Sequence, residues 1–138
     1  MIPWKRYFFI RLLYSLSLSD KPASYAGICD QIMKLDPKIR FAGIINNKGR
    51  LIDGGMKDGI STLSSAKDDE MLFMELVIRV KMRQEFDAKL GKVKFAMALR
   101  EKILEMSFQV DNHILFVVSE SGDDFEVLPK KILKIIGK

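Results

Sequence analysis

The sequence predicts an α+β fold with the element order helix, strand, strand, helix, strand, strand, strand, helix. Three patterns support this prediction. Apolar residues recur at helical spacing in residues 24–35 and 65–90. Between these segments, residues 40–53 contain two short apolar runs separated by a turn sequence. After Gly91 the apolar residues recur at every second position, as they do in strands.

The composition is typical of one globular domain. The chain has 138 residues, of which 48% are hydrophobic and 30% charged, so it can bury a core without a metal ion or a disulfide. Its single cysteine fits a reducing cytoplasm. No run of about 18 apolar residues is free of charge, which argues against an integral membrane protein.

The net charge of +5 is concentrated at the beginning of the chain. Residues 1–23 carry four basic side chains against one aspartate, a net charge of +3, which leaves only +2 for residues 24–138. A nucleic-acid surface would gather lysine, arginine and stacking aromatics on a folded face. We therefore expect no nucleic-acid partner.

Residues 1–23 form a basic, apolar extension, and residues 24–138 form the single domain. The extension has three interpretations: a signal peptide, although Arg11 interrupts its apolar stretch; an amphipathic helix lying on an anionic lipid surface; or a tail that packs on nothing, including an upstream extension from a misassigned start codon. On the second interpretation the candidate membrane contacts are Trp4, Lys5, Arg6, Phe8, Phe9 and Arg11.

The first half of the domain contains a helix and a hairpin. Ser24 is expected to cap a helix that runs to about Leu35 and ends at Asp36–Pro37. Strands at 40–46 and 50–53 flank an Asn-Lys-Gly turn. We expect the glycine-rich sequence that follows, from Gly54 to about residue 65, to be a flexible connection.

A long helix is expected from Ser65 to about Leu90, with Ser65 and Asp68 as a capping box and Gly91 as its end. Seven of the eight residues in 71–78 are apolar, more than one stripe facing a sheet requires. The apolar positions divide between two sides of the helix, one with Phe73, Leu76, Val77 and Val80 and the other with Met71, Met74, Ile78 and Met82. The first side can cover the protein's own sheet, and the second needs a partner.

The second half of the domain reads as three strands and a helix. The strands are expected at 93–99, 103–110 and 113–118, and the continuous apolar run of the last one favours a central strand covered on both faces. A final helix carries apolar residues from Leu128 to Gly137, with Pro129 in its first turn.

No sequence motif for a known reaction is present. The segment 54–59 lacks the spacing of a phosphate-binding loop. His113 is the only histidine, and Cys29 occupies a core-spaced helical position, which favours a buried thiol over a nucleophile. We therefore expect no catalytic residue, no metal site and no cofactor, and a protein that is not an enzyme.

The element order, the hairpin sequence FAGIINNKGRLIDGG and the strand DNHILFVVSES before a terminal helix resemble the roadblock/dynein light chain family, which has a profilin-like fold related to longin domains. The resemblance covers residues 24–137. It implies a five-stranded antiparallel sheet with the first and last helices on one face and the long middle helix on the other. The sequence departs from the family at residues 122–127, before the last helix, and in its basic leader.

The same resemblance implies a homodimer formed by the middle helix and the following edge strand, acting as a scaffold or regulator for small Ras-like GTPases. The residues at the matching positions are Met71, Met74, Ile78 and Met82 on the helix, and Val93–Leu99 on the edge strand, including Phe95 and Met97.

The leading functional hypothesis is a non-enzymatic dimeric scaffold or regulator in cytoplasmic signalling. Its partner would be a second copy of the chain or a paralogue, together with a small Ras-like GTPase. Two alternatives are a small-molecule sensor of profilin-like fold and an adaptor recruited to membranes through residues 4–14.

Overall fold

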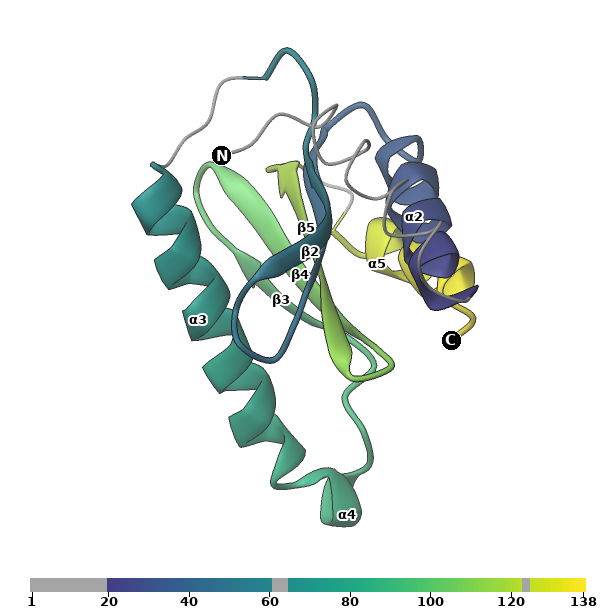
Figure 1. The fold of residues 1–138 in the computed structure, drawn as a ribbon, viewed down its shortest axis with the longest axis vertical. Helices are drawn as coiled ribbons and strands as arrows, with labels where there is room; N and C mark the ends of the chain where they lie inside the picture. Colours follow the sequence, from purple (N-terminus) through teal and green to yellow (C-terminus); the bar gives the residue numbers. More distant parts are fainter. Residues whose placement is uncertain (1–19, 61–64, 123–124) are drawn as a thin grey trace.

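A computed structural model describes residues 20–60, 65–122 and 125–138 (Figure 1). The expected order of helices and strands is confirmed, with one additional short helix. The elements are α2 (Asp20–Met33), β1 (Ile39–Ile45), β2 (Leu51–Met56), α3 (Ala66–Gln84), α4 (Asp87–Leu90), β3 (Ala96–Leu99), β4 (Ile103–Val110), β5 (His113–Glu120) and α5 (Val127–Ile135).

The five strands form one antiparallel sheet in the order β2-β1-β5-β4-β3. The central position of β5 confirms the expectation drawn from its apolar run. Successive side chains of a strand point to opposite faces, and Leu115 and Val117 join one core cluster while Ile114 and Phe116 join the other. A strand covered on both faces requires such a continuous run.

Helices cover both faces of the sheet, as the roadblock resemblance implies (Figure 1). On one face α2 and α5 lie side by side, and Cys29, Ile32 and Ile132 pack there with no exposed surface. On the other face α3 is the single covering helix among the described residues. The result is a three-layer α+β domain.

Three element boundaries differ from the expectation. The first helix begins at Asp20, so Ser24 lies inside it and is not its N-cap. The long helix ends at Gln84, and α4 follows after a break at Phe86. There the Phe86 amide donates to the Arg83 carbonyl oxygen at 3.1 Å, a bond to the third preceding residue that tightens the turn. The third strand is limited to Ala96–Leu99, shorter than the expected 93–99.

The expected flexible connection is wrong at Gly54 and Gly55, which belong to β2, and its residues 61–64 lie outside the described part of the chain. Gly54 has φ +80°, and a Cβ atom there would overlap the carbonyl oxygen of Ala42 and lie 3.0 Å from Cys29 Sγ. The glycine therefore allows α2 and β1 to approach β2 closely, which residues with side chains would prevent.

The start of α3 follows the sequence signal. Ser65 Oγ accepts a hydrogen bond from the Asp68 amide at 3.1 Å, and the Asp68 carboxylate accepts one from the Ser65 amide at 3.3 Å. This capping box satisfies two of the amide groups that a helix leaves without partners at its N-terminus. It fixes where the helix begins, and with it the positions of the side chains that follow.

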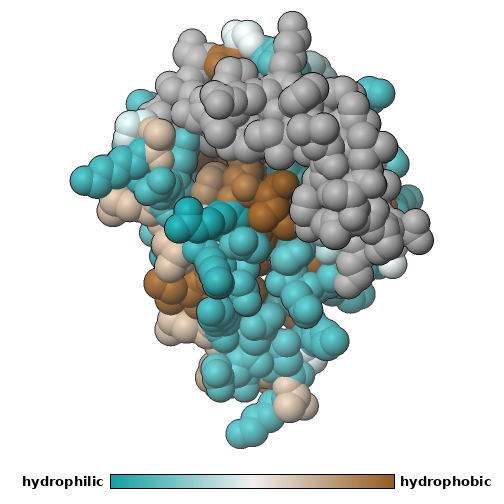
Figure 2. Space-filling view, in the orientation of Figure 1, coloured by the Kyte–Doolittle hydropathy of each residue, from teal (hydrophilic) through white to brown (hydrophobic). Residues whose placement is uncertain are grey.

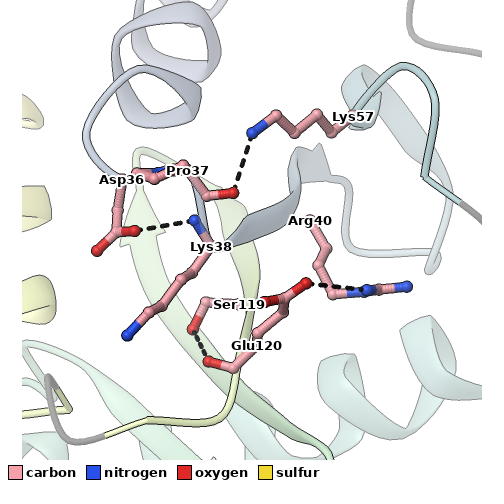
Figure 3. Close-up of polar contacts among 7 residues, drawn as sticks. All are labelled: Asp36, Pro37, Lys38, Arg40, Lys57, Ser119 and Glu120. Atoms are coloured by element: carbon pink, nitrogen blue, oxygen red, sulfur yellow. Dashed lines mark hydrogen bonds and ion pairs between the residues drawn. The ribbon is translucent and has the colours of Figure 1, made fainter.

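Polar contacts hold the α2–β1 loop at the end of the sheet (Figure 3). Lys57 Nζ donates to the Pro37 carbonyl oxygen at 3.0 Å, which joins the end of β2 to this loop. Arg40 on β1 pairs with Glu120 at the end of β5 at 3.6 Å. These contacts are structural, since they join segments that the sheet already brings together.

Among the described residues, no helix combines the length and the apolar character needed to cross a bilayer. The candidate membrane contacts Trp4, Lys5, Arg6, Phe8, Phe9 and Arg11 lie outside the described residues.

We predict that Gly54→Ala destabilises the protein more than Gly59→Ala. Both glycines have φ near +80°, but a Cβ at Gly59 would have no atom within 4 Å. Gly59→Ala should therefore cost only the strain of a left-handed alanine, about 1 kcal/mol. Gly54→Ala should cost about 3 kcal/mol because overpacking is added. Equal losses in urea unfolding would contradict this account of β2.

Candidate interaction surface

The outer side of α3 carries a stripe of exposed apolar side chains. Met71 is 64% exposed, Met74 44%, Ile78 51% and Met82 64%, and these four residues form what we call the α3 stripe. Figure 2 shows brown and tan side chains along the α3 edge of the molecule, among teal ones. Each of the four side chains is on the side of the helix that the sequence spacing predicted.

The opposite side of α3 fixes the helix to the sheet. Phe73, Val77 and Val80 are buried, and the ring of Phe73 lies 5.9 Å from that of Phe41 and 6.2 Å from that of Phe116. Aromatic pairs at such distances add to the burial energy of the rings themselves. Because this side is held by the core, the α3 stripe is held facing outward.

Charges around the α3 stripe are divided along the helix. Residues 66–75 contain one lysine and four carboxylates, a net charge of −3, whereas residues 76–84 contain three basic residues and no acidic one, a net charge of +3. Glu70, Glu75, Arg79 and Lys81 are all exposed beside the stripe. Two copies of α3 that lie antiparallel would therefore have complementary electrostatic surfaces.

A groove of about 190 Å³ separates α3 from the edge strands β3 and β4. Two ion pairs line it: Arg79 with Glu75 and Arg100 with Glu105, each at 3.1 Å. The hydrogen bond and the charge of Glu105 raise the pKa of Arg100, which stays protonated. Strand β3 pairs only with β4, so within the described residues its outer backbone edge is open.

The structure does not bring Phe95 and Met97 onto the α3 stripe. Both are partly buried against the core on the α2 and α5 side, and the Phe95 ring lies 6.1 Å from that of Phe108. Met97 also lines the groove beside α3. Met97 lies in the edge strand β3, as expected, whereas Phe95 precedes the strand, which is shorter than expected. Both residues help to build the core.

Two further exposed apolar residues, which the sequence analysis does not single out, follow the α3 stripe in the chain. Phe86 is 58% exposed and Leu90 81% exposed, at the break after α3 and at the end of α4. They follow Met82 at intervals of four residues, a signal present in the sequence.

The thiol of Cys29 is fully buried, and the ring of His113 packs edge-on against Tyr25, with centroids 5.5 Å apart. Nucleophilic catalysis needs a thiol that a substrate can reach. The structure therefore gives Cys29 a place in the core. Among the described residues, no three His, Cys, Asp or Glu side chains are grouped as a metal site would require.

One family model, described as a family of unknown function (DUF6659), matches residues 21–138. The chain belongs to this family. Among curated proteins, none matches it.

Solved structures show the fold of this DUF6659 protein to be roadblock-like. The Roadblock/LC7 domain from Streptomyces avermitilis has a TM-score of 0.59 and 10% identity, with 79% of this chain and 88% of that one covered. The gliding protein MglB from Thermus thermophilus has a TM-score of 0.63 and 13% identity, covering 86% and 90%. MglB in a tetrameric arrangement gives 0.60 and 13%, covering 79% and 82%. At these identities the likeness shows the fold alone.

We predict that Cys29 in the native DUF6659 protein does not react with a thiol reagent such as dithionitrobenzoate until the protein unfolds. Its exposed surface is zero, so modification has to wait for opening of the α2 layer. The rate should rise with urea in parallel with the unfolded fraction. Rapid modification under native conditions would show that α2 is not packed as described.

Proposed function

We propose that the protein is a non-enzymatic, cytoplasmic, dimeric scaffold or regulator whose self-association uses α3 and the edge strand β3. The observation that supports this most is the exposed α3 stripe on a helix whose other side is already buried. A contiguous apolar patch on an otherwise polar surface is typical of a protein interface. Methionine side chains suit such an interface because they adapt to the shape of a partner.

The charges of α3 favour a second copy in antiparallel orientation. When two α3 helices lie side by side in opposite directions, the −3 half of each faces the +3 half of the other. Glu70 then lies near Lys81 of the partner subunit, on one flank of the stripe. The parallel arrangement would put like charges together, which specific interfaces avoid.

The strand β3 supports the same arrangement. Its outer edge offers unpaired backbone amides and carbonyls next to α3, and exposed strand edges readily pair with another chain. Pairing of β3 with its copy would place both α3 helices on one face of a continuous sheet. Sequence composition does not separate a homodimer from a heterodimer with a paralogue, but the self-complementary charge of α3 favours the homodimer.

A small Ras-like GTPase is the partner that the roadblock resemblance implies for such a dimer. The MglB structure described as a tetrameric arrangement supports self-association as something that this fold allows. The sensor alternative is less favoured, because the spaces between α3 and the sheet measure about 190 and 60 Å³. The larger space of about 1,020 Å³ lies along the α3 stripe and is lined by α3 residues alone, so no second element closes it around a ligand. Small-molecule sites typically measure about 300–1,000 Å³.

We predict that Met74→Glu with Ile78→Glu yields a folded monomer. Two carboxylates would be buried without partners at the centre of the interface, which should weaken self-association at least about 100-fold. Size-exclusion chromatography and circular dichroism measure both properties. The single variant Ile78→Glu should also weaken self-association. Its matched control is Val127→Glu on α5, because both side chains are 51% exposed.

The control should remain a dimer. An unchanged dimer of the Met74→Glu, Ile78→Glu variant would contradict the assignment of the α3 stripe. Loss of its folded circular dichroism spectrum would instead show that the two residues belong to the core.

We also predict the direction of the two helices by disulfide cross-linking. In the antiparallel pair, Met71 of one protomer lies beside Met82 of the partner subunit, whereas two copies of Met71 are separated by about 16 Å along the axis. Met71→Cys mixed with Met82→Cys should therefore give a covalent dimer under mild oxidation, and either variant alone should not. Cross-linking of Met71→Cys with itself would contradict the antiparallel arrangement.

A further inference from the structure

The outer face of α5 is a lysine face that the proposed dimer leaves uncovered. Val127, Lys130, Lys131 and Lys134 are exposed, and at 100° per residue they project from one side of the helix. Leu128, Pro129 and Ile132 are buried on the opposite side against the core. The apolar side of α5 is thus buried in the core, and the polar side chains on its outer side are lysines.

These lysines are not paired with any carboxylate of the residues that the structure describes. Within the described part of the chain, Lys130, Lys131 and Lys134 take part in no ion pair, whereas Arg79 and Arg100 next to α3 are each paired with a glutamate. Residues 125–138 contain four lysines and one glutamate, a net charge of +3, while α3 has a net charge of zero. The residues around α5 are therefore more positive than those of α3, while residues 34–60 carry the same net charge of +3 and Asp123 and Asp124 precede this segment in the sequence.

Apolar side chains lie at the N-terminal end of the lysine face. Val127 is 51% exposed and Phe125 is 38% exposed. They precede Lys130 in the chain and reach solvent at the point where α5 begins. Lysines together with a few exposed apolar side chains are the combination that anionic membrane surfaces attract, through charge and shallow insertion.

We infer that the lysine face of α5, with Val127 and Phe125 at its end, docks the protein on an anionic phospholipid surface. The inference goes beyond self-association, and only one part of it rests on the proposed dimer. Antiparallel pairing of β3 around a two-fold axis places α5 of both protomers on the same side of the joined sheet. Six lysines, three from each protomer, would then face one plane, which suits a flat membrane.

A bilayer fits this face better than a nucleic acid or an acidic peptide. The face contains lysines and no arginine, and it offers neither guanidinium forks for phosphate nor a row of aromatic rings for bases. It also lies on a convex helix, and the groove of about 190 Å³ is on the other side of the sheet, beside α3. An anionic bilayer is flat and fluid, so it can bind a convex helix without a groove.

The test uses the full chain and sedimentation with vesicles of phosphatidylcholine, with or without about 30% phosphatidylserine. The test variant combines Lys130→Gln, Lys131→Gln and Lys134→Gln. The matched control combines Lys48→Gln, Lys89→Gln and Lys92→Gln, three exposed lysines outside α5 that remove the same charge. Both variants keep residues 1–23, so any membrane contact of that extension contributes equally to both.

The wild type and the control should bind the vesicles that contain phosphatidylserine, and added salt should weaken this binding. The α5 variant should bind them roughly 100-fold more weakly, because each lysine near an anionic surface contributes about fivefold. Equal binding by the two variants would overturn the inference. The inference would also be overturned if the α5 variant bound vesicles as well as the wild type does but bound duplex DNA more weakly.

Oligomeric state separates this inference from the proposed function. The α5 variant should remain a dimer in size-exclusion chromatography, since α5 lies away from α3 and β3. A wild type that is a monomer but still needs its α5 lysines for vesicle binding would contradict the dimer and leave the lipid inference standing. A wild type that is a dimer but does not bind vesicles containing phosphatidylserine would support the dimer and overturn the lipid inference.

Discussion

Burial of one side of α3 against the sheet is the interaction on which the rest of the structure depends. Phe73, Val77 and Val80 complete a core that β1 and β5 cannot close by themselves, because β5 is apolar on both faces. The helix has more apolar side chains than the core buries. The surplus is exposed as the α3 stripe, and the rigidity of the buried side keeps it in one orientation.

The two faces of the domain therefore differ in kind. The α3 side is apolar, balanced in charge and flanked by an open strand edge, features suited to a second copy of the same chain. The α5 side has used its apolar residues in the core and presents lysines to solvent. One sheet thus separates the proposed surface for self-association from the proposed surface for an anionic membrane. The two can be occupied at the same time.

Local signals predicted the elements that local interactions determine. The capping box at Ser65 and Asp68 and the hairpin turn at Gly49 depend on neighbours in the sequence, and both were found. The run of glycines and serines from Gly54 to Ser65 predicts a flexible connection there. The place of Gly54 in β2 is explained by the close approach of the Ala42 carbonyl oxygen on β1 and of Cys29 on α2. The helix breaks at Phe86 without a glycine or a proline, so the sequence does not predict the break. The exposure of Phe86 and Leu90 was therefore not predicted.

The most direct test of the central claim is light scattering of the full chain during size-exclusion chromatography, over a wide range of concentrations. If α3 and β3 mediate self-association, the mass should be twice the 15.8 kDa of the chain and should fall towards that value only on dilution. A mass of one chain at every concentration would contradict the account. The α3 stripe would then have to be covered by a different protein.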